Sequence, residues 1–145
     1  MQSSETFETS SAEETYEIGR KFGSLAEAGS VFALDGDLGA GKTVFAKGFA
    51  AGLGITENVS SPTFTILQIY DSGRLELYHY DAYRIEDPSE MEEIGYTEYF
   101  YGKGTCLVEW PGNISAYFPK HYTKISIERE PEKGLDHRRI TVTRI

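Results

Sequence analysis

The chain of 145 residues has one cysteine, no long apolar run and a shortage of positive charge, and each absence excludes a class of protein. Because Cys106 is the single cysteine, an internal disulfide is excluded, and its apolar neighbours predict a small buried side chain rather than a nucleophile. No apolar run approaches the length that a membrane-spanning helix needs. Residues 1–11 contain no lysine, no arginine and no apolar stretch, so we expect no secretory signal and a soluble, cytoplasmic protein.

Lysine and arginine number 14 against 23 aspartates and glutamates, which gives a net charge of −9. This balance argues against free binding of nucleic acid through a broad basic face. Acidic residues gather in two clusters, within residues 5–17 and 86–93. Each cluster is either a solvated face or a surface that docks on a basic partner. With 39% hydrophobic residues, we expect one folded domain over residues 1–145.

The most informative stretch is GDLGAGKT at residues 36–43, which fits the phosphate-loop pattern G-x-x-x-x-G-K-[ST] at every fixed position. Residues 30–35 before it form a short apolar run that is typical of a buried strand. Residues 44–53 after it have helical spacing, and Gly54 is placed to end that helix. Strand, glycine loop and helix in succession are the context that a phosphate-binding loop requires.

The residue types of this loop predict its chemistry. Glycines let the backbone curl, so that its N–H groups point at phosphate oxygens, and the start of the next helix adds its positive dipole end. Lys42 supplies positive charge for the β- and γ-phosphates, and the Thr43 hydroxyl is a ligand for Mg²⁺. The predicted nucleotide-binding residues of the loop are Leu38, Gly39, Ala40, Gly41, Lys42 and Thr43.

The remaining pattern predicts an α/β fold: a P-loop NTPase domain with a mixed central sheet, helices on both faces and antiparallel hairpins. A helix begins near Ala12, capped by Ser10 or Ser11, and carries Thr15, Ile18, Phe22 and Leu25 on one face. Further short helices are expected over 89–94 and 97–101. The predicted strands span residues 6–9, 30–35, 65–70, 74–80, 105–108, 122–128 and 138–143. The third and fourth form one hairpin, and the last two form another.

A phosphate loop needs a second acid for the metal, and α/β sites form at the carboxyl ends of strands. Glu109 and Asp81 each follow an apolar or β-rich run, so both fit this place. We predict Thr43 and Glu109 around Mg²⁺, directly or through water, and Asp81 near the attacking water. The predicted catalytic residues are Asp81, Glu109 and Lys42. The alternative is that Glu109 and Asp81 are ordinary strand-end carboxylates. Asp35, on the strand that enters the loop, is expected to have a structural role.

Other residues near the predicted site have two interpretations. The polar side chains of residues 60–63 either sense the γ-phosphate or form a plain Ser-Pro turn. Trp110 packs either on the site or on a partner. Arg84 either stabilises charge in cis or pairs with nearby acids, and His79 is expected to pack at a strand end.

Several of these segments occur together in an order and spacing that resemble the TsaE family, bacterial ATPases of transfer-RNA modification. They are GDLGAGKT at 36–43, SPTF at 61–64, HYDAYR at 79–84, EIG at 93–95 and LVEW at 107–110. The match covers roughly residues 11–119 and is loose after Lys120. Ser11, at the start of the first helix, resembles a family position near the nucleotide, although a helix cap explains it equally well.

The resemblance implies a subunit that works with TsaD and TsaB to make threonylcarbamoyladenosine at position 37 of transfer RNA. Such a protein binds Mg-ATP at the TsaD–TsaB assembly and hydrolyses it to reset the assembly, slowly alone and faster with its partners. The transfer RNA would be handled by the complex and not by this chain alone. The family's metal-site glutamate falls on Glu109 and its essential aspartate on Asp81, while its loop residues fall on Lys42 and Thr43.

Other functions share the phosphate loop and stay open as alternatives. A small-molecule kinase generally needs an arginine-bearing lid, whereas only Arg74 and Arg84 lie in the central region. A GTP-driven switch needs a guanine-reading N-K-x-D segment, which the chain lacks. A further alternative, which is not an enzyme, is a module that binds nucleotide without hydrolysing it.

Overall fold

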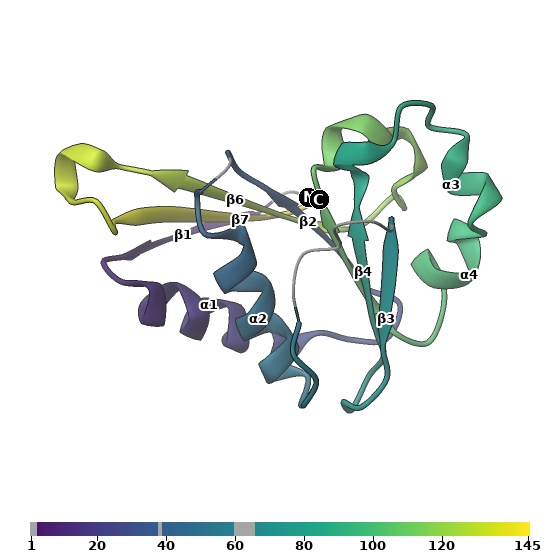
Figure 1. Cartoon of the computed structure of the whole chain (residues 1–145), viewed down its shortest axis with the longest axis horizontal. Helices are drawn as coiled ribbons and strands as arrows, with labels where there is room; N and C mark the ends of the chain where they lie inside the picture. Colours follow the sequence, from purple (N-terminus) through teal and green to yellow (C-terminus); the bar gives the residue numbers. More distant parts are fainter. Residues whose placement is uncertain (1–2, 38, 60–65) are drawn as a thin grey trace.

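The computed structural model describes residues 3–37, 39–59 and 66–145, and its centre is one seven-stranded mixed sheet (Figure 1). The strand order is β1-β7-β6-β2-β5-β4-β3, in which β6, β2, β5 and β4 are parallel neighbours. The other pairs, β1 with β7, β7 with β6 and β4 with β3, are antiparallel. The strands are β1 (Ser3–Thr9), β2 (Val31–Asp35), β3 (Leu67–Tyr70), β4 (Leu77–Asp81), β5 (Thr105–Glu109), β6 (Thr123–Arg129) and β7 (Arg138–Arg144).

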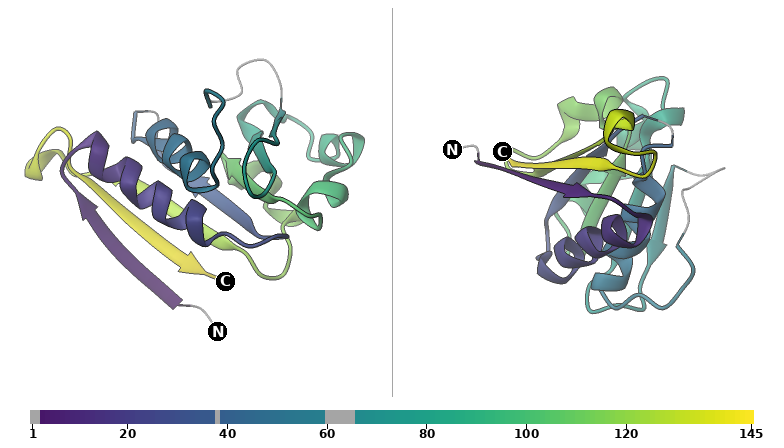
Figure 2. Two further views of the ribbon diagram at one scale, coloured as in Figure 1. Left: turned by 90° about the horizontal axis from the view of Figure 1, so that it is seen from below. Right: turned by 90° about the vertical axis from the view of Figure 1, so that its left-hand side faces the viewer.

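Helices cover both faces of this sheet. The helices α1 (Ala12–Leu25) and α2 (Lys42–Gly52) lie side by side against one face (Figure 2). The short helices α3 (Glu90–Glu93) and α4 (Tyr96–Phe100) pack on the other face. Three 3₁₀ turns complete the described elements: η1 (Ala82–Arg84), η2 (Pro111–Tyr117) and η3 (Pro131–Lys133). No described helix has both the length and the apolar character that crossing a membrane would require.

Each face of the sheet has its own hydrophobic core, because successive strand residues point to opposite sides. On β5, Leu107 joins the core beneath α1 and α2, whereas Cys106 and Val108 join the core with Met91 and Phe100. Cys106 is fully buried, as predicted, and burial raises the pKa of its thiol. The two cores hold β2, β5 and β4 between them, so the central strands are buried on both faces.

The α/β fold with both predicted hairpins is confirmed, and the differences lie at element ends. The first strand is longer than expected, because β1 pairs with β7 from Ser3 to Thr9. Leu25 does not share the buried face predicted for it and is 62% exposed. Helix α1 ends at Leu25, and the core positions at this end belong to Phe22 and Ala26.

Four glycines allow α1 and α2 to pack with their backbones in contact. Gly19 and Gly23 lie one turn apart on α1, and Gly48 and Gly52 lie one turn apart on α2. A Cβ atom on any of them would overlap a carbonyl oxygen of the opposite helix. For Gly48 that oxygen belongs to Tyr16. Because α2 begins at the phosphate loop, this close contact also fixes where the loop lies.

We expect Gly48→Ala to lower the free energy of unfolding by about 1–3 kcal/mol, as overpacking of a core does. The direction is diagnostic, since replacing glycine by alanine inside a helix ordinarily stabilises by about 0.5–1 kcal/mol. Urea unfolding measures the difference. Gly112→Ala is the control, because an added Cβ there meets no atom within 4 Å, and it should change stability by less than about 0.5 kcal/mol. A Gly48→Ala variant as stable as the parent would contradict the contact.

Candidate functional site

The predicted phosphate loop joins the end of β2 to the start of α2, at the carboxyl ends of the parallel strands (Figure 1). Gly39 and Gly41 have φ angles of 79° and 105°, in the left-handed region that favours glycine. Helix α2 begins at Lys42, two residues earlier than the sequence pattern indicated, and the positive end of its dipole lies at the loop. Leu38, one of the predicted binding residues, lies outside the described residues.

A cavity of about 480 Å³ opens beside this loop and brings the predicted residues together. Loop residues form one wall, and Asp81 and Glu109 are adjacent in register at the ends of β4 and β5. The sequence pattern predicts both acids at strand ends but does not show that the two strands are neighbours. The lining residues are Gly39, Gly41, Lys42, Thr43, Val44, Asp81, Tyr83, Glu109, Trp110 and Arg138.

Lys42 is the most unusual group of the cavity. Its side chain is 6% exposed, and Nζ lies 3.3 Å from the centroid of the Trp110 ring. Within the described part of the chain, Nζ has no hydrogen-bond partner. Burial lowers the pKa of Lys42, against the opposing effect of nearby carboxylates, of which Glu109 acts most strongly. A buried ammonium without hydrogen bonds is costly, and a phosphate in the cavity would satisfy it.

Trp110 packs on the site, which decides between the two interpretations left open by its sequence position. Its backbone has a φ angle of 58°, rare for a residue other than glycine, and it turns the chain directly after Glu109. Besides contacting Lys42, its ring lies 5.1 Å from the ring of Tyr83. Tyr83 is 63% exposed, so this aromatic pair forms the solvent-facing rim of the cavity.

The two acids are held by different partners. Glu109 is 3% exposed, and its Oε2 lies 2.6 Å from Nε2 of His79. Asp81 is half-buried, and its Oδ1 accepts a hydrogen bond from the backbone N–H of Tyr83 at 3.0 Å. His79 was expected to pack at a strand end. It is instead the middle residue of β4, and its ring contacts Glu109, the predicted metal ligand.

Arg138 is a residue of the site that the sequence analysis missed. Its Nε donates to the carbonyl oxygen of Ala40 at 2.9 Å, and Nη2 donates to that of Gly39 at 3.4 Å. Arg138 opens β7, and the adjacent hairpin tip is tied to β1 by an ion pair of 2.8 Å between Lys133 and Glu8. These contacts hold two loop carbonyls from outside. Arg138 and Ala40 are 98 residues apart in the chain, so no local sequence pattern predicts their contact.

Ser11 is the N-cap of α1, where its hydroxyl accepts from the backbone N–H of Glu14 at 3.2 Å. The Glu14 carboxylate accepts from the N–H of Ser10 at 2.6 Å, one residue before the N-cap, so the pair of bonds resembles a capping box shifted by one residue. Ser11 is not among the residues that line the cavity, so a contact with nucleotide stays a prediction. The expectations for residues 60–63 and for the side chain of Arg84 lie outside the part of the chain that the structure describes.

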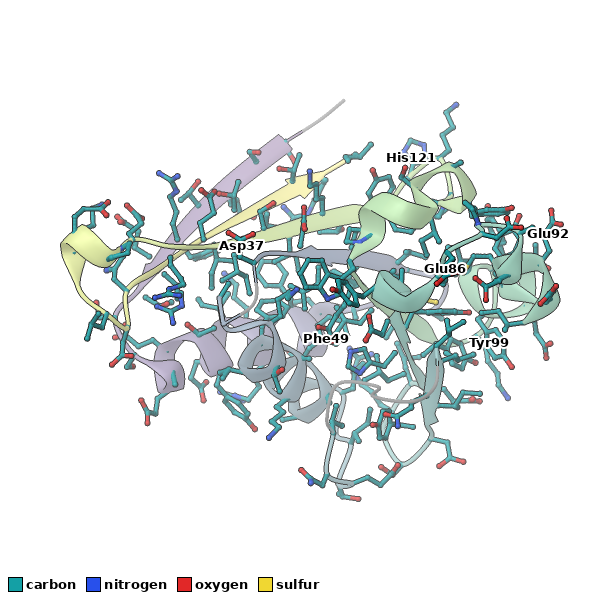
Figure 3. All side chains as sticks on the ribbon, turned by 45° about the horizontal axis from the view of Figure 1, so that its top comes forward. Asp37, Phe49, Glu86, Glu92, Tyr99 and His121 are labelled. Carbon is teal, nitrogen blue, oxygen red and sulfur yellow. The ribbon has the colours of Figure 1, made fainter. Side chains whose placement is uncertain are left out.

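The acidic cluster at 86–93 lies away from the phosphate loop. Figure 3 shows Glu86 and Glu92 with Tyr99 at the α3–α4 end of the molecule, apart from Asp37 on the loop. These carboxylates are exposed. None of residues 86–93 lines the cavity. Both interpretations of this cluster, as a solvated face or as a docking face, remain.

Comparison with known proteins identifies the family. Residues 9–140 match the family described as threonylcarbamoyl adenosine biosynthesis protein TsaE. The chain belongs to the TsaE family. A tRNA threonylcarbamoyladenosine biosynthesis protein TsaE from Bacillus subtilis is 50% identical over 137 residues, which cover 94% of this chain and 84% of the relative. The TsaE protein of Treponema pallidum is 46% identical, over 81% of this chain and 86% of the relative.

A solved structure agrees with the fold. The crystal structure of Bacillus subtilis YdiB superposes with a TM-score of 0.85 at 43% identity, over all of this chain and 88% of that one. The family resemblance and the P-loop α/β fold inferred from the sequence are thus confirmed for this TsaE-family chain. The roles assigned to individual residues stay predictions.

We expect nucleotide binding to change the fluorescence of Trp110, the only tryptophan of the chain. Phosphates would draw the Lys42 ammonium away from the ring, a contact worth about 0.5–2 kcal/mol. Titration with Mg-ATP should shift or quench the emission. In Lys42→Met, which keeps the length of the side chain without its charge, affinity should fall about tenfold or more, as loss of a charged hydrogen bond implies. Parent-like affinity in that variant would contradict the assignment of Lys42.

Proposed function

We propose that this chain binds Mg-ATP in the cavity beside residues 36–43 and hydrolyses it in the biosynthesis of threonylcarbamoyladenosine in transfer RNA. The observation that carries the proposal is the convergence of Lys42, Thr43, Asp81 and Glu109 on one cavity. Family membership supports the pathway, since the relatives bear that biosynthetic name. The 145 residues would act as one P-loop ATPase unit in the cytoplasm.

The chain's own groups have separate tasks in this proposal. Loop N–H groups cradle the phosphates, and Lys42 leaves Trp110 to contact the β- and γ-phosphates. Thr43, Glu109 and Asp81 all line the cavity. Thr43 and Glu109 would hold the metal, directly or through water, and Asp81 would lie near the water that attacks the γ-phosphate. Bound Mg²⁺ would supply positive charge that offsets the negative charge developing on the phosphates. The products are ADP and inorganic phosphate.

We further propose that TsaD and TsaB are the partners and that ATP hydrolysis resets their assembly between turnovers. The net charge of −9 supports a division of labour in which the complex, not this chain alone, holds the transfer RNA. Nothing favours the kinase alternative. Among the described residues, the cationic side chains that line the cavity are Lys42 and Arg138, and Arg138 is engaged with loop carbonyls.

The proposal is tested by measuring ATP hydrolysis with Mg²⁺, first by this chain alone and then with TsaD and TsaB added. We expect slow turnover alone and clear stimulation by the partners. Equal turnover with and without them would contradict a role at that assembly. A search for a phosphorylated small-molecule product would then separate a kinase from a stand-alone ATPase.

Replacing Glu109 by Gln should affect the metal-dependent step more than binding. We expect Mg²⁺-dependent hydrolysis to fall about 10–100-fold or more, the usual cost of disturbing a metal site. ATP affinity measured in EDTA should change by less than about threefold, because the loop and Lys42 remain. Glu128→Gln is the control, since Glu128 is an exposed acid paired with Arg139. Equal loss of hydrolysis and metal-free binding would demote Glu109 to a structural role.

A further inference from the structure

A buried histidine contacts the carboxylate that we assign to the metal. His79 is 0% exposed, and its Nε2 lies 2.6 Å from Oε2 of Glu109. An ionised carboxylate only accepts hydrogen bonds, so with Glu109 ionised, as a metal ligand would be, Nε2 of His79 would be the donor. The other ring nitrogen, Nδ1, is also buried and has no partner within residues 3–37, 39–59 and 66–145. Within this described part of the chain, Glu109 is the hydrogen-bond partner of the His79 ring.

The parallel register explains why the two side chains meet. His79 pairs with Leu107 and Asp81 pairs with Glu109 across β4 and β5. Alternate residues share a face, so His79 lies one step behind the two acids on the face that also carries α2. His79 does not line the cavity. Because the ring is also 0% exposed, we expect it to act through Glu109 and not on a ligand directly.

The carboxylates of Asp81 and Glu109 end neighbouring strands, where like charges repel each other. Asp81 is fixed by its hydrogen bond from the N–H of Tyr83. Glu109 has a longer side chain with more rotatable bonds, and it needs a partner of its own to keep one orientation. The hydrogen bond from His79 supplies that orientation in a water-poor position, where such a bond is strong.

We propose that His79 is a positioning residue, which orients the Glu109 carboxylate for Mg²⁺ before the metal arrives. The inference rests on the proposed function, since it takes Glu109 as a metal ligand. Residues that hydrogen-bond to metal ligands commonly contribute a factor of about 10–100 to metal affinity or activity. His79 would contribute through the geometry of Glu109 alone, without touching nucleotide or metal.

The test measures metal affinity directly, with Mn²⁺ as an electron paramagnetic resonance probe in the presence of saturating ADP. His79→Leu removes the donor and fills much of the space. We expect its Mn²⁺ affinity to fall about 10–100-fold, while its ADP affinity in EDTA stays within about threefold of the parent. His79→Gln keeps an N–H donor near the place of Nε2 and should recover most of the Mn²⁺ affinity. A structural role alone would lower both affinities together and would not be rescued by Gln.

Tyr80→Phe is the matched control, because Tyr80 adjoins His79, is equally buried and faces the opposite core. It should bind Mn²⁺ as the parent does. If His79→Leu does not fold, His79→Gln is compared with His79→Asn, whose shorter side chain does not reach Glu109. Equal Mn²⁺ affinity of those two variants, or parent-like affinity of His79→Leu, overturns the inference alone. A parent chain that binds no Mn²⁺ with ADP overturns the proposed function and this inference with it.

Discussion

Parallel pairing of β2 with β5, and of β5 with β4, is the constraint on which the candidate site depends. Because the strands run in one direction, their carboxyl ends meet at one edge of the sheet. The phosphate loop leaves β2 there, Glu109 ends β5 there and Asp81 ends β4 there. Burial of these strands on both faces makes the register costly to change, since a slip of one residue would move every side chain to the other face.

Contacts from the rest of the fold hold the loop against that edge. The glycine faces of α1 and α2 fix the helix that follows the loop, and Arg138 holds loop carbonyls from the far hairpin. Lys42 is left buried against Trp110 instead of exposed to water. Among the described residues its ammonium has no hydrogen-bond partner, so phosphate oxygens in the cavity would offer it hydrogen bonds that these residues do not.

The sequence predicts what local patterns encode. GDLGAGKT fits the phosphate-loop pattern, and an acid after an apolar run marks a strand end. The four residues singled out in this way, Lys42, Thr43, Asp81 and Glu109, line one cavity, and their roles stay predictions. Contacts that depend on register could not be read in this way. The hydrogen bond between His79 and Glu109 requires the pairing of β4 with β5. The contact of Arg138 with the loop requires the predicted β6–β7 hairpin to lie beside β2, and the sequence does not show the pairing of β6 with β2. The exposure of Leu25 followed from where α1 ends, which helical spacing alone does not fix.

The most direct measurement is a crystal structure with Mg²⁺ and a non-hydrolysable ATP analogue. We expect phosphates along residues 36–43, a metal ion held by Thr43 and Glu109 directly or through water, and Lys42 moved from Trp110 to the phosphates. His79 should keep its hydrogen bond to Glu109. A nucleotide bound elsewhere, a metal ion held without Glu109, or Lys42 still resting on Trp110 would contradict it.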